Sequence, residues 1–172
     1  MLLVLACLIS LLGFAQDSED DGWNLKFHDY AVQDTEMFHG QPASPQIVEK
    51  KHLTFRTAIT DAARKGPNFA GHYTVAEWDC GADCISLAVV DEPTGKVFSA
   101  PFDTLTTPFA EGTADEPAHE FQGAVYQLKS RLFIADGCPE DKRCATYYYE
   151  WKDEKFKMLR MVPHRGPSRP AD

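Results

Sequence analysis

The sequence lacks the short motifs that identify several large classes of hydrolase. It contains neither the G-x-S-x-G turn that presents a nucleophilic serine nor the H-E-x-x-H pair that binds catalytic zinc. Its 6 histidines are scattered along the chain. A catalytic site would therefore have to be assembled in space from distant residues, and the sequence favours a non-catalytic protein.

The chain also lacks an excess of positive charge. It has 17 Lys and Arg residues against 26 Asp and Glu residues, so its formal net charge is −9. A surface of this sign repels the phosphates of nucleic acids and the headgroups of anionic membranes. We therefore expect no nucleic-acid partner.

No Lys or Arg precedes the apolar run at the N-terminus, although a secretory signal usually has one there. In other respects residues 1–15 suit such a signal. The run is too short to span a bilayer, and the small residues Gly13 and Ala15 favour cleavage after Ala15. The alternative is a lipoprotein signal processed at Cys7, which would leave apolar residues 8–12 at the mature N-terminus. Both alternatives predict an exported protein, periplasmic or extracellular, with no transmembrane span after cleavage.

The rest of the chain has the length of a single domain with its own core. Residues 16–22 form an acidic lead-in, and residues 163–172 form a Pro-rich tail; both compositions are typical of disorder. We therefore assign the folded domain to residues 23–162.

Four cysteines remain after the signal, and an even number in an exported chain predicts two disulfides. The spacing favours the pairs Cys80–Cys84 and Cys138–Cys144, with the two crossed pairings as alternatives. A redox dithiol usually has the tighter C-x-x-C spacing at a helix N-terminus, and only one pair has the spacing of a zinc knuckle. We expect structural disulfides, with no metal and no cofactor.

Apolar residues recur at helical spacing between Phe55 and Ala63, and Gly66 followed by Pro67 should end this helix. Most of the remaining chain has β character. Residues 84–91 are apolar on both faces, which predicts a central strand covered on both sides. The predicted strands are residues 24–30, 73–79, 84–91, 96–100, 124–128, 131–136, 145–151 and 156–161, and residues 101–121 are predicted to be a loop-rich connection.

These elements predict an α+β fold in which one main helix packs on a predominantly antiparallel sheet of about seven strands. The sheet could curl toward a barrel or toward a sandwich. Each cysteine pair brackets a short connection between two strands that should be antiparallel. Since directly opposed residues in such a pair approach closely enough for a disulfide, each bridge should staple a hairpin.

Five motifs together resemble a group of small exported bacterial proteins of unassigned function. They are PNFAGHY at 67–73, CGADC at 80–84, VVDEPTGK at 89–96, SRL at 130–132 and YYEW at 148–151. The resemblance covers residues 55–159. It implies an exported, disulfide-bearing bacterial domain, and it implies no activity.

Two groups of residues are candidates for a ligand surface. Asn68 and His72 lie at the predicted junction between helix and sheet, although they could instead serve the helix exit and the core. Tyr147, Tyr149 and Trp151 share one face of a predicted strand, where an exposed aromatic row could bind a sugar or a protein. The alternative for that row is a place in the core.

Two functions of different classes remain. The first is a non-catalytic module that binds a protein, a glycan or a small ligand, with an enzyme of basic charge as one special target. The second is an exported hydrolase whose site is assembled from His72, Glu77, Asp79 and Asp136.

Overall fold

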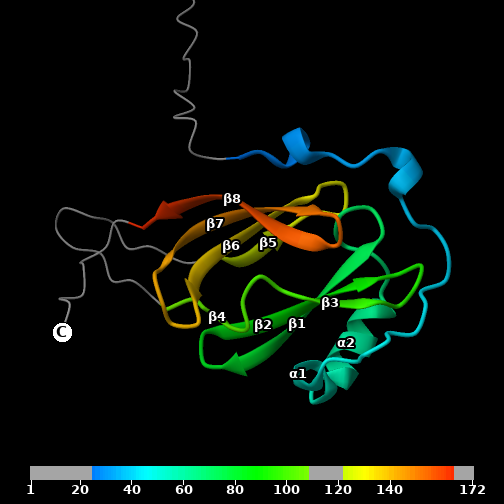
Figure 1. The fold of residues 1–172 in the computed structure, drawn as a ribbon, viewed down its shortest axis with the longest axis horizontal. Helices are drawn as coiled ribbons and strands as arrows, with labels where there is room; N and C mark the ends of the chain where they lie inside the picture. Colours follow the sequence, from blue (N-terminus) through cyan, green and yellow to red (C-terminus); the bar gives the residue numbers. More distant parts are fainter. Residues whose placement is uncertain (1–24, 109–121, 165–172) are drawn as a thin grey trace, which may run out of the picture.

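The strands form one antiparallel sheet that folds back on itself into two facing layers (Figure 1). A computed structural model describes residues 25–108 and 122–164. The predicted signal and acidic lead-in lie outside these residues, as does the predicted tail from residue 165 onward. Within the described residues the sheet is not closed into a barrel, since β1 and β8 stand at its two ends.

The described residues form four helical elements and eight strands. The helical elements are η1 (Phe27–Tyr30), η2 (Asp34–Glu36), α1 (Lys50–Leu53) and α2 (Arg56–Ala63). The strands are β1 (Tyr73–Gly81), β2 (Cys84–Asp91), β3 (Val97–Ser99), β4 (Leu105–Thr106), β5 (Gly123–Tyr126), β6 (Leu132–Pro139), β7 (Ala145–Lys152) and β8 (Lys155–Pro163).

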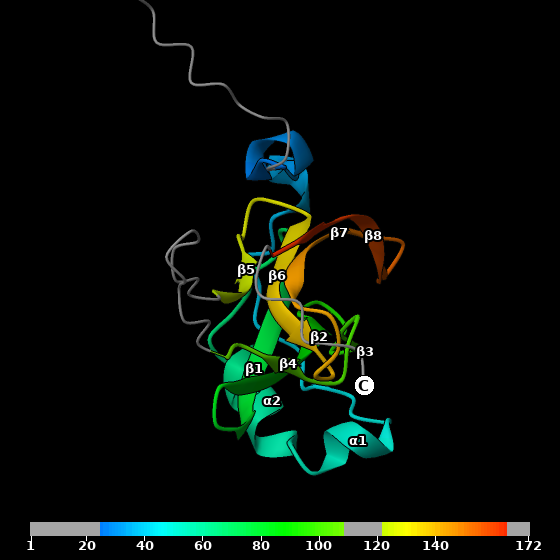
Figure 2. The same cartoon turned by 90° about the vertical axis from the view of Figure 1, so that its left-hand side faces the viewer.

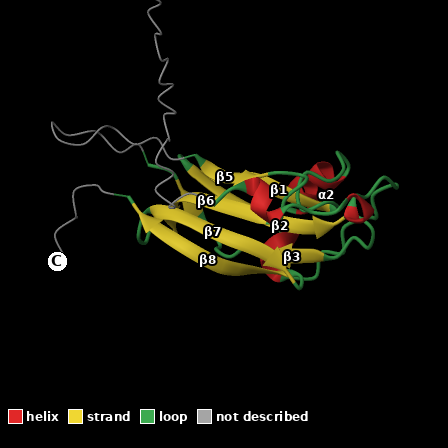
Figure 3. Ribbon diagram, turned by 90° about the horizontal axis from the view of Figure 1, so that it is seen from above, coloured by secondary structure: helices red, strands yellow, loops and turns green. Residues whose placement is uncertain are grey.

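One layer consists of β1, β2 and β3, and the other consists of β5, β6, β7 and β8. The two-residue strand β4 pairs with β2 on one side and with β6 on the other, so it joins the layers. β1 and β5 lie on the same side of the molecule, while β8 lies on the opposite side (Figures 2 and 3). The predicted α+β fold is confirmed, with one more strand than expected.

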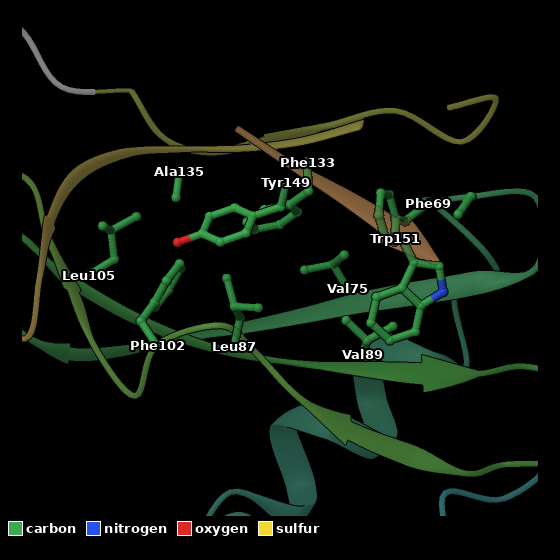
Figure 4. Close-up of a cluster of buried hydrophobic side chains, with 11 residues drawn as sticks. Phe69, Val75, Leu87, Val89, Phe102, Leu105, Phe133, Ala135, Tyr149 and Trp151 are labelled. Carbon is green, nitrogen blue, oxygen red and sulfur yellow. The ribbon is translucent and has the colours of Figure 1, made fainter. Parts of the chain in front are cut away.

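The main core fills the space between the two layers. Side chains from β6 and β7 face side chains from β1 and β2 across it (Figure 4). Phe69, from the connection between α2 and β1, is fully buried among these side chains. The buried members of this core are Phe69, Ala70, Val75, Leu87, Val89, Phe102, Leu105, Phe133, Ala135, Tyr149 and Trp151.

A second, smaller core lies between α2 and the outer face of β1 and β2. Ile59 and Ala63 of the helix are buried against small side chains of the sheet, including Ala76 and Ala88. Residues 87–90 of β2 are therefore buried on both faces. This arrangement confirms the prediction that residues 84–91 form a central strand covered on both sides.

Both predicted disulfides are present, and each staples a hairpin. Cys80–Cys84 closes the turn between β1 and β2, with a Cα–Cα distance of 5.2 Å. Cys138–Cys144 closes the turn between β6 and β7, with a Cα–Cα distance of 4.0 Å. Within the described residues, no helix is both long and apolar enough to cross a membrane.

Three expectations about the elements need correction. The strand predicted at residues 24–30 is wrong, because residues 27–30 form the 3₁₀ turn η1, whose Phe27 and Tyr30 are three residues apart on one side of the turn. The predicted loop 101–121 contains β4, which is too short to show a pattern. Pro163 belongs to β8 and His164 contacts Asp136, so the domain extends beyond residue 162.

Candidate functional site

The side-chain amide of Asn68 substitutes for a neighbouring strand along the edge of β1. Its Oδ1 accepts the backbone N–H of Val75 at 2.7 Å, and its Nδ2 donates to the carbonyl of Val75 at 3.1 Å. The backbone of Phe69 pairs with Tyr73 in the same way, two residues earlier along this edge. The first half of the β1 edge is thus satisfied by the connection that leads into the strand.

The second half of the same edge has no partner strand among the described residues. Backbone groups in an antiparallel pair alternate between facing the partner strand and facing away from it. The backbone N–H and C=O groups of Tyr73 and Val75 face away from β2. By this alternation, the backbone groups of Glu77 and Asp79 also face away from β2. Within residues 25–108 and 122–164, no hydrogen bond reaches the backbone N–H or C=O groups of Glu77 and Asp79 along this edge. Such a row of unpaired groups is a template for another strand.

A cavity of about 460 Å³ lies beside this open edge. We call it the edge cavity. It lies between the end of α2, the free edge of β1 and Tyr126 of β5. Its lining residues are Ala62 and Lys65 from the end of α2, Gly66, Pro67 and Asn68 from the connection, Val75 and Glu77 from β1, and Tyr126 from β5.

Glu77 and Tyr126 both line the edge cavity. Desolvation of the Glu77 carboxyl raises its pKa, and the neighbouring Tyr126 hydroxyl opposes that rise. Desolvation and the nearby Glu77 charge raise the pKa of the Tyr126 hydroxyl, so this group stays protonated. Because a carboxylate has room for about four hydrogen bonds, Glu77 can accept further donors from a ligand.

His72 lies away from the edge cavity's lining and has contacts of its own. Its Nδ1 lies 3.2 Å from the backbone carbonyl of Glu36, which can only accept, so Nδ1 carries the proton of that bond. Its Nε2 lies 3.6 Å from Oδ1 of Asp91, and its ring packs on Tyr73. These contacts dock the segment around η2 onto the start of β1.

The predicted aromatic row belongs mostly to the core. Tyr149 and Trp151 are buried between the layers, and only Tyr147 is partly exposed. The Tyr147 hydroxyl donates to the backbone carbonyl of Arg143 at 2.6 Å. The alternative interpretation of this row as core is therefore the correct one for Tyr149 and Trp151.

Three residues of the possible hydrolase site have neighbours outside that set. His72 faces Asp91, Glu77 lies beside Tyr126, and Asp136 pairs with His164. Asp79 is exposed. Among the described residues, no hydrogen bond or ion pair joins His72, Glu77 and Asp79 to one another.

Asp136, Thr146 and His164 bring together the residue types of a catalytic triad, but with a different geometry. His164 Nε2 lies 2.7 Å from Asp136 Oδ1 and 3.3 Å from Thr146 Oγ1. A triad uses opposite ring nitrogens for these two contacts. Gln122 also donates its backbone N–H to Asp136 at 3.0 Å. The cluster therefore ties together the ends of four neighbouring strands.

Glu92 is a fully buried acid that the sequence analysis did not single out. Thr74 Oγ1 donates to the carbonyl of Gly66 at 2.8 Å and is also hydrogen-bonded to Glu92 Oε1. Because a hydroxyl has one proton, both bonds form together only if the proton of the second comes from Glu92. Burial correspondingly raises the pKa of Glu92, so the folded state favours its neutral form.

Replacing Glu92 with glutamine is expected to flatten the pH dependence of stability. A pKa raised in the folded state makes folding most favourable below the unfolded pKa, and this contribution is lost as the pH rises through the folded pKa. Glutamine keeps the shape of the neutral acid and cannot ionise. Urea unfolding from about pH 4 to about pH 8 should therefore show a smaller loss of stability for Glu92→Gln than for the wild type. Parallel curves would contradict the assignment, and Glu49→Gln serves as an exposed control.

Comparison of the chain with known protein families, with curated proteins and with solved structures finds no match.

Proposed function

We propose that the protein is an exported, non-catalytic module that binds an extended segment of another protein along the open edge of β1. The observation that carries this proposal is that the edge backbone groups of Glu77 and Asp79, beside the edge cavity, have no partner within residues 25–108 and 122–164. A peptide that adds a strand there would gain main-chain hydrogen bonds, and one of its side chains would enter the cavity.

The chemistry of the site favours a basic side chain at that position. Glu77 lines the cavity and Asp79 is exposed further along the strand. The net charge of the chain, −9, draws positively charged partners from a distance. Since desolvation raises the pKa of Glu77, a cationic group beside its carboxylate would offset that unfavourable effect.

Export and membership of the bacterial group remain part of this proposal. Two disulfides support export, because such bonds persist in oxidising compartments. The hydrolase alternative has less support, since His72, Glu77 and Asp136 each have a neighbour outside the proposed site.

Selection of displayed random peptides on the full mature protein tests the proposal. We expect enriched peptides to contain Lys or Arg within a segment of high β-propensity. Glu77→Gln should weaken their binding about tenfold by removing the charge. Asp79→Pro should abolish binding by removing an edge N–H, a change that an edge strand tolerates.

Glu140→Gln is the matched control, because it removes the same charge from an exposed position in the turn between β6 and β7. Its affinity for the selected peptides should equal that of the wild type. Peptides that bind Asp79→Pro as tightly as the wild type would overturn the proposal, as would a selection that enriches no sequence.

A further inference from the structure

A second cavity, of about 330 Å³, shares no lining residue with the edge cavity. We call it the outer pocket. It is bounded by α1, by the start of α2, by the ends of β1 and β2 near the first disulfide, and by the connection between β3 and β4. The residues that matter most here are His52, Phe55, Trp78, Phe102 and Asp103.

Four of the ten residues that line the outer pocket are aromatic. The rings of Phe55 and Trp78 stack with their centroids 4.7 Å apart, and His52 meets Trp78 edge-on at 6.4 Å. Phe102 supplies a further apolar wall and is itself buried. Flat aromatic walls of this kind favour a planar apolar ligand, and the volume lies at the lower end of the range of small-molecule sites.

Two nitrogens in these walls have no hydrogen-bond partner among the described residues. They are Nδ1 of His52 and Nε1 of Trp78. His52 is only 3% exposed, so its unpaired nitrogen is costly. The indole nitrogen can only donate, whereas a neutral imidazole can donate or accept. Desolvation lowers the pKa of His52, which favours the neutral ring.

The rim of the outer pocket is held in place by polar contacts. Lys51 Nζ lies 2.8 Å from Asp103 Oδ1, which joins α1 to the connection after β3. The Ser86 hydroxyl donates to the backbone carbonyl of Asp103 at 2.9 Å. These contacts connect α1 and β2 to the segment that carries Phe102 and Asp103.

We infer that the outer pocket binds a small planar aromatic molecule that carries a hydroxyl group. The ring lies against Phe55, Trp78 and Phe102. Its oxygen accepts from the indole N–H of Trp78 and donates to His52 after a small side-chain adjustment, which satisfies both nitrogens. This site is separate from the edge cavity and does not depend on the function proposed for it.

Titration of the mature protein with 2-naphthol, and with naphthalene as the probe that lacks the hydroxyl, tests this inference. The indole N–H resonances of the tryptophans are followed by NMR, and the signal of Trp78 is identified by its loss in Trp78→Phe. We expect 2-naphthol to move the Trp78 resonance downfield and to bind about tenfold more tightly than naphthalene.

Two variants give the test its controls. Trp78→Phe should reduce the affinity for 2-naphthol to that for naphthalene, while Glu77→Gln in the edge cavity should leave both affinities unchanged. The comparison of the two affinities in the wild type needs no variant, so it tests the inference even if Trp78→Phe folds poorly. Equal affinities for the two probes would overturn the inference, and so would a Trp78 resonance that 2-naphthol does not move.

Discussion

Replacing Phe69 with alanine is expected to lower the free energy of unfolding by about 3–5 kcal/mol. The side chain is fully buried and lies between the two layers, so its removal leaves a cavity that the surrounding rings cannot fill. Its loss also removes four ring contacts with centroid distances of 6.0 to 6.3 Å, to Tyr126, Phe133, Trp151 and Phe156.

Urea unfolding of the oxidised protein measures this effect. Phe98→Ala is a suitable control, because Phe98 is only partly buried and contacts the same core from β3. Its loss of stability should be clearly smaller. If the two variants lost equal stability, the central place of Phe69 would be refuted.

Replacing Gly71 with alanine is expected to cost about 3 kcal/mol, against about 1 kcal/mol for the same change at Gly66. Both glycines have a positive φ, 84° at Gly71 and 85° at Gly66, so alanine is in the same unfavourable range of φ in both variants. A Cβ at Gly71 would lie 2.7 Å from the backbone oxygen of Glu36, whereas a Cβ at Gly66 would meet nothing within 4 Å.

The difference between the stability losses of these two variants measures the steric contact of the added Cβ separately from the backbone strain. The contact matters because the same Glu36 carbonyl accepts from His72, and the Gly71 carbonyl accepts from Phe38 at 3.0 Å. Thermal unfolding of both variants compares them directly. Equal losses would mean that the η2 segment moves aside at no cost.

The strands were predictable where burial follows a local pattern. Residues 84–91 are apolar on both faces, and β2 begins and ends at the predicted residues. β4 could not be predicted, because two residues show no period and this strand is defined by its partners β2 and β6. Residues 27–30 were assigned to a strand because their mixture of apolar and polar side chains suits either a short strand or a 3₁₀ turn.

The candidate site was predictable only in part, for a related reason. Asn68 and Glu77 stand out in the sequence, but their roles depend on their neighbours. Asn68 is hydrogen-bonded to the backbone of Val75, and Glu77 lies beside Tyr126. Tyr126 is far away in the sequence and reaches Glu77 only because the layers fold together. Glu92 resembles an ordinary residue of an exposed turn, and its burial depends on the packing around Thr74.

The place of β4 gives the two disulfides a shared consequence. Thr106 pairs with Cys84 on one side and with Cys138 on the other, so each bridge fixes one neighbour of this short strand. Oxidation of both cysteine pairs therefore constrains both partners of the strand that joins the layers. Reduction of either bridge removes this constraint from one side of β4 and leaves the pairing to its backbone hydrogen bonds and to the core.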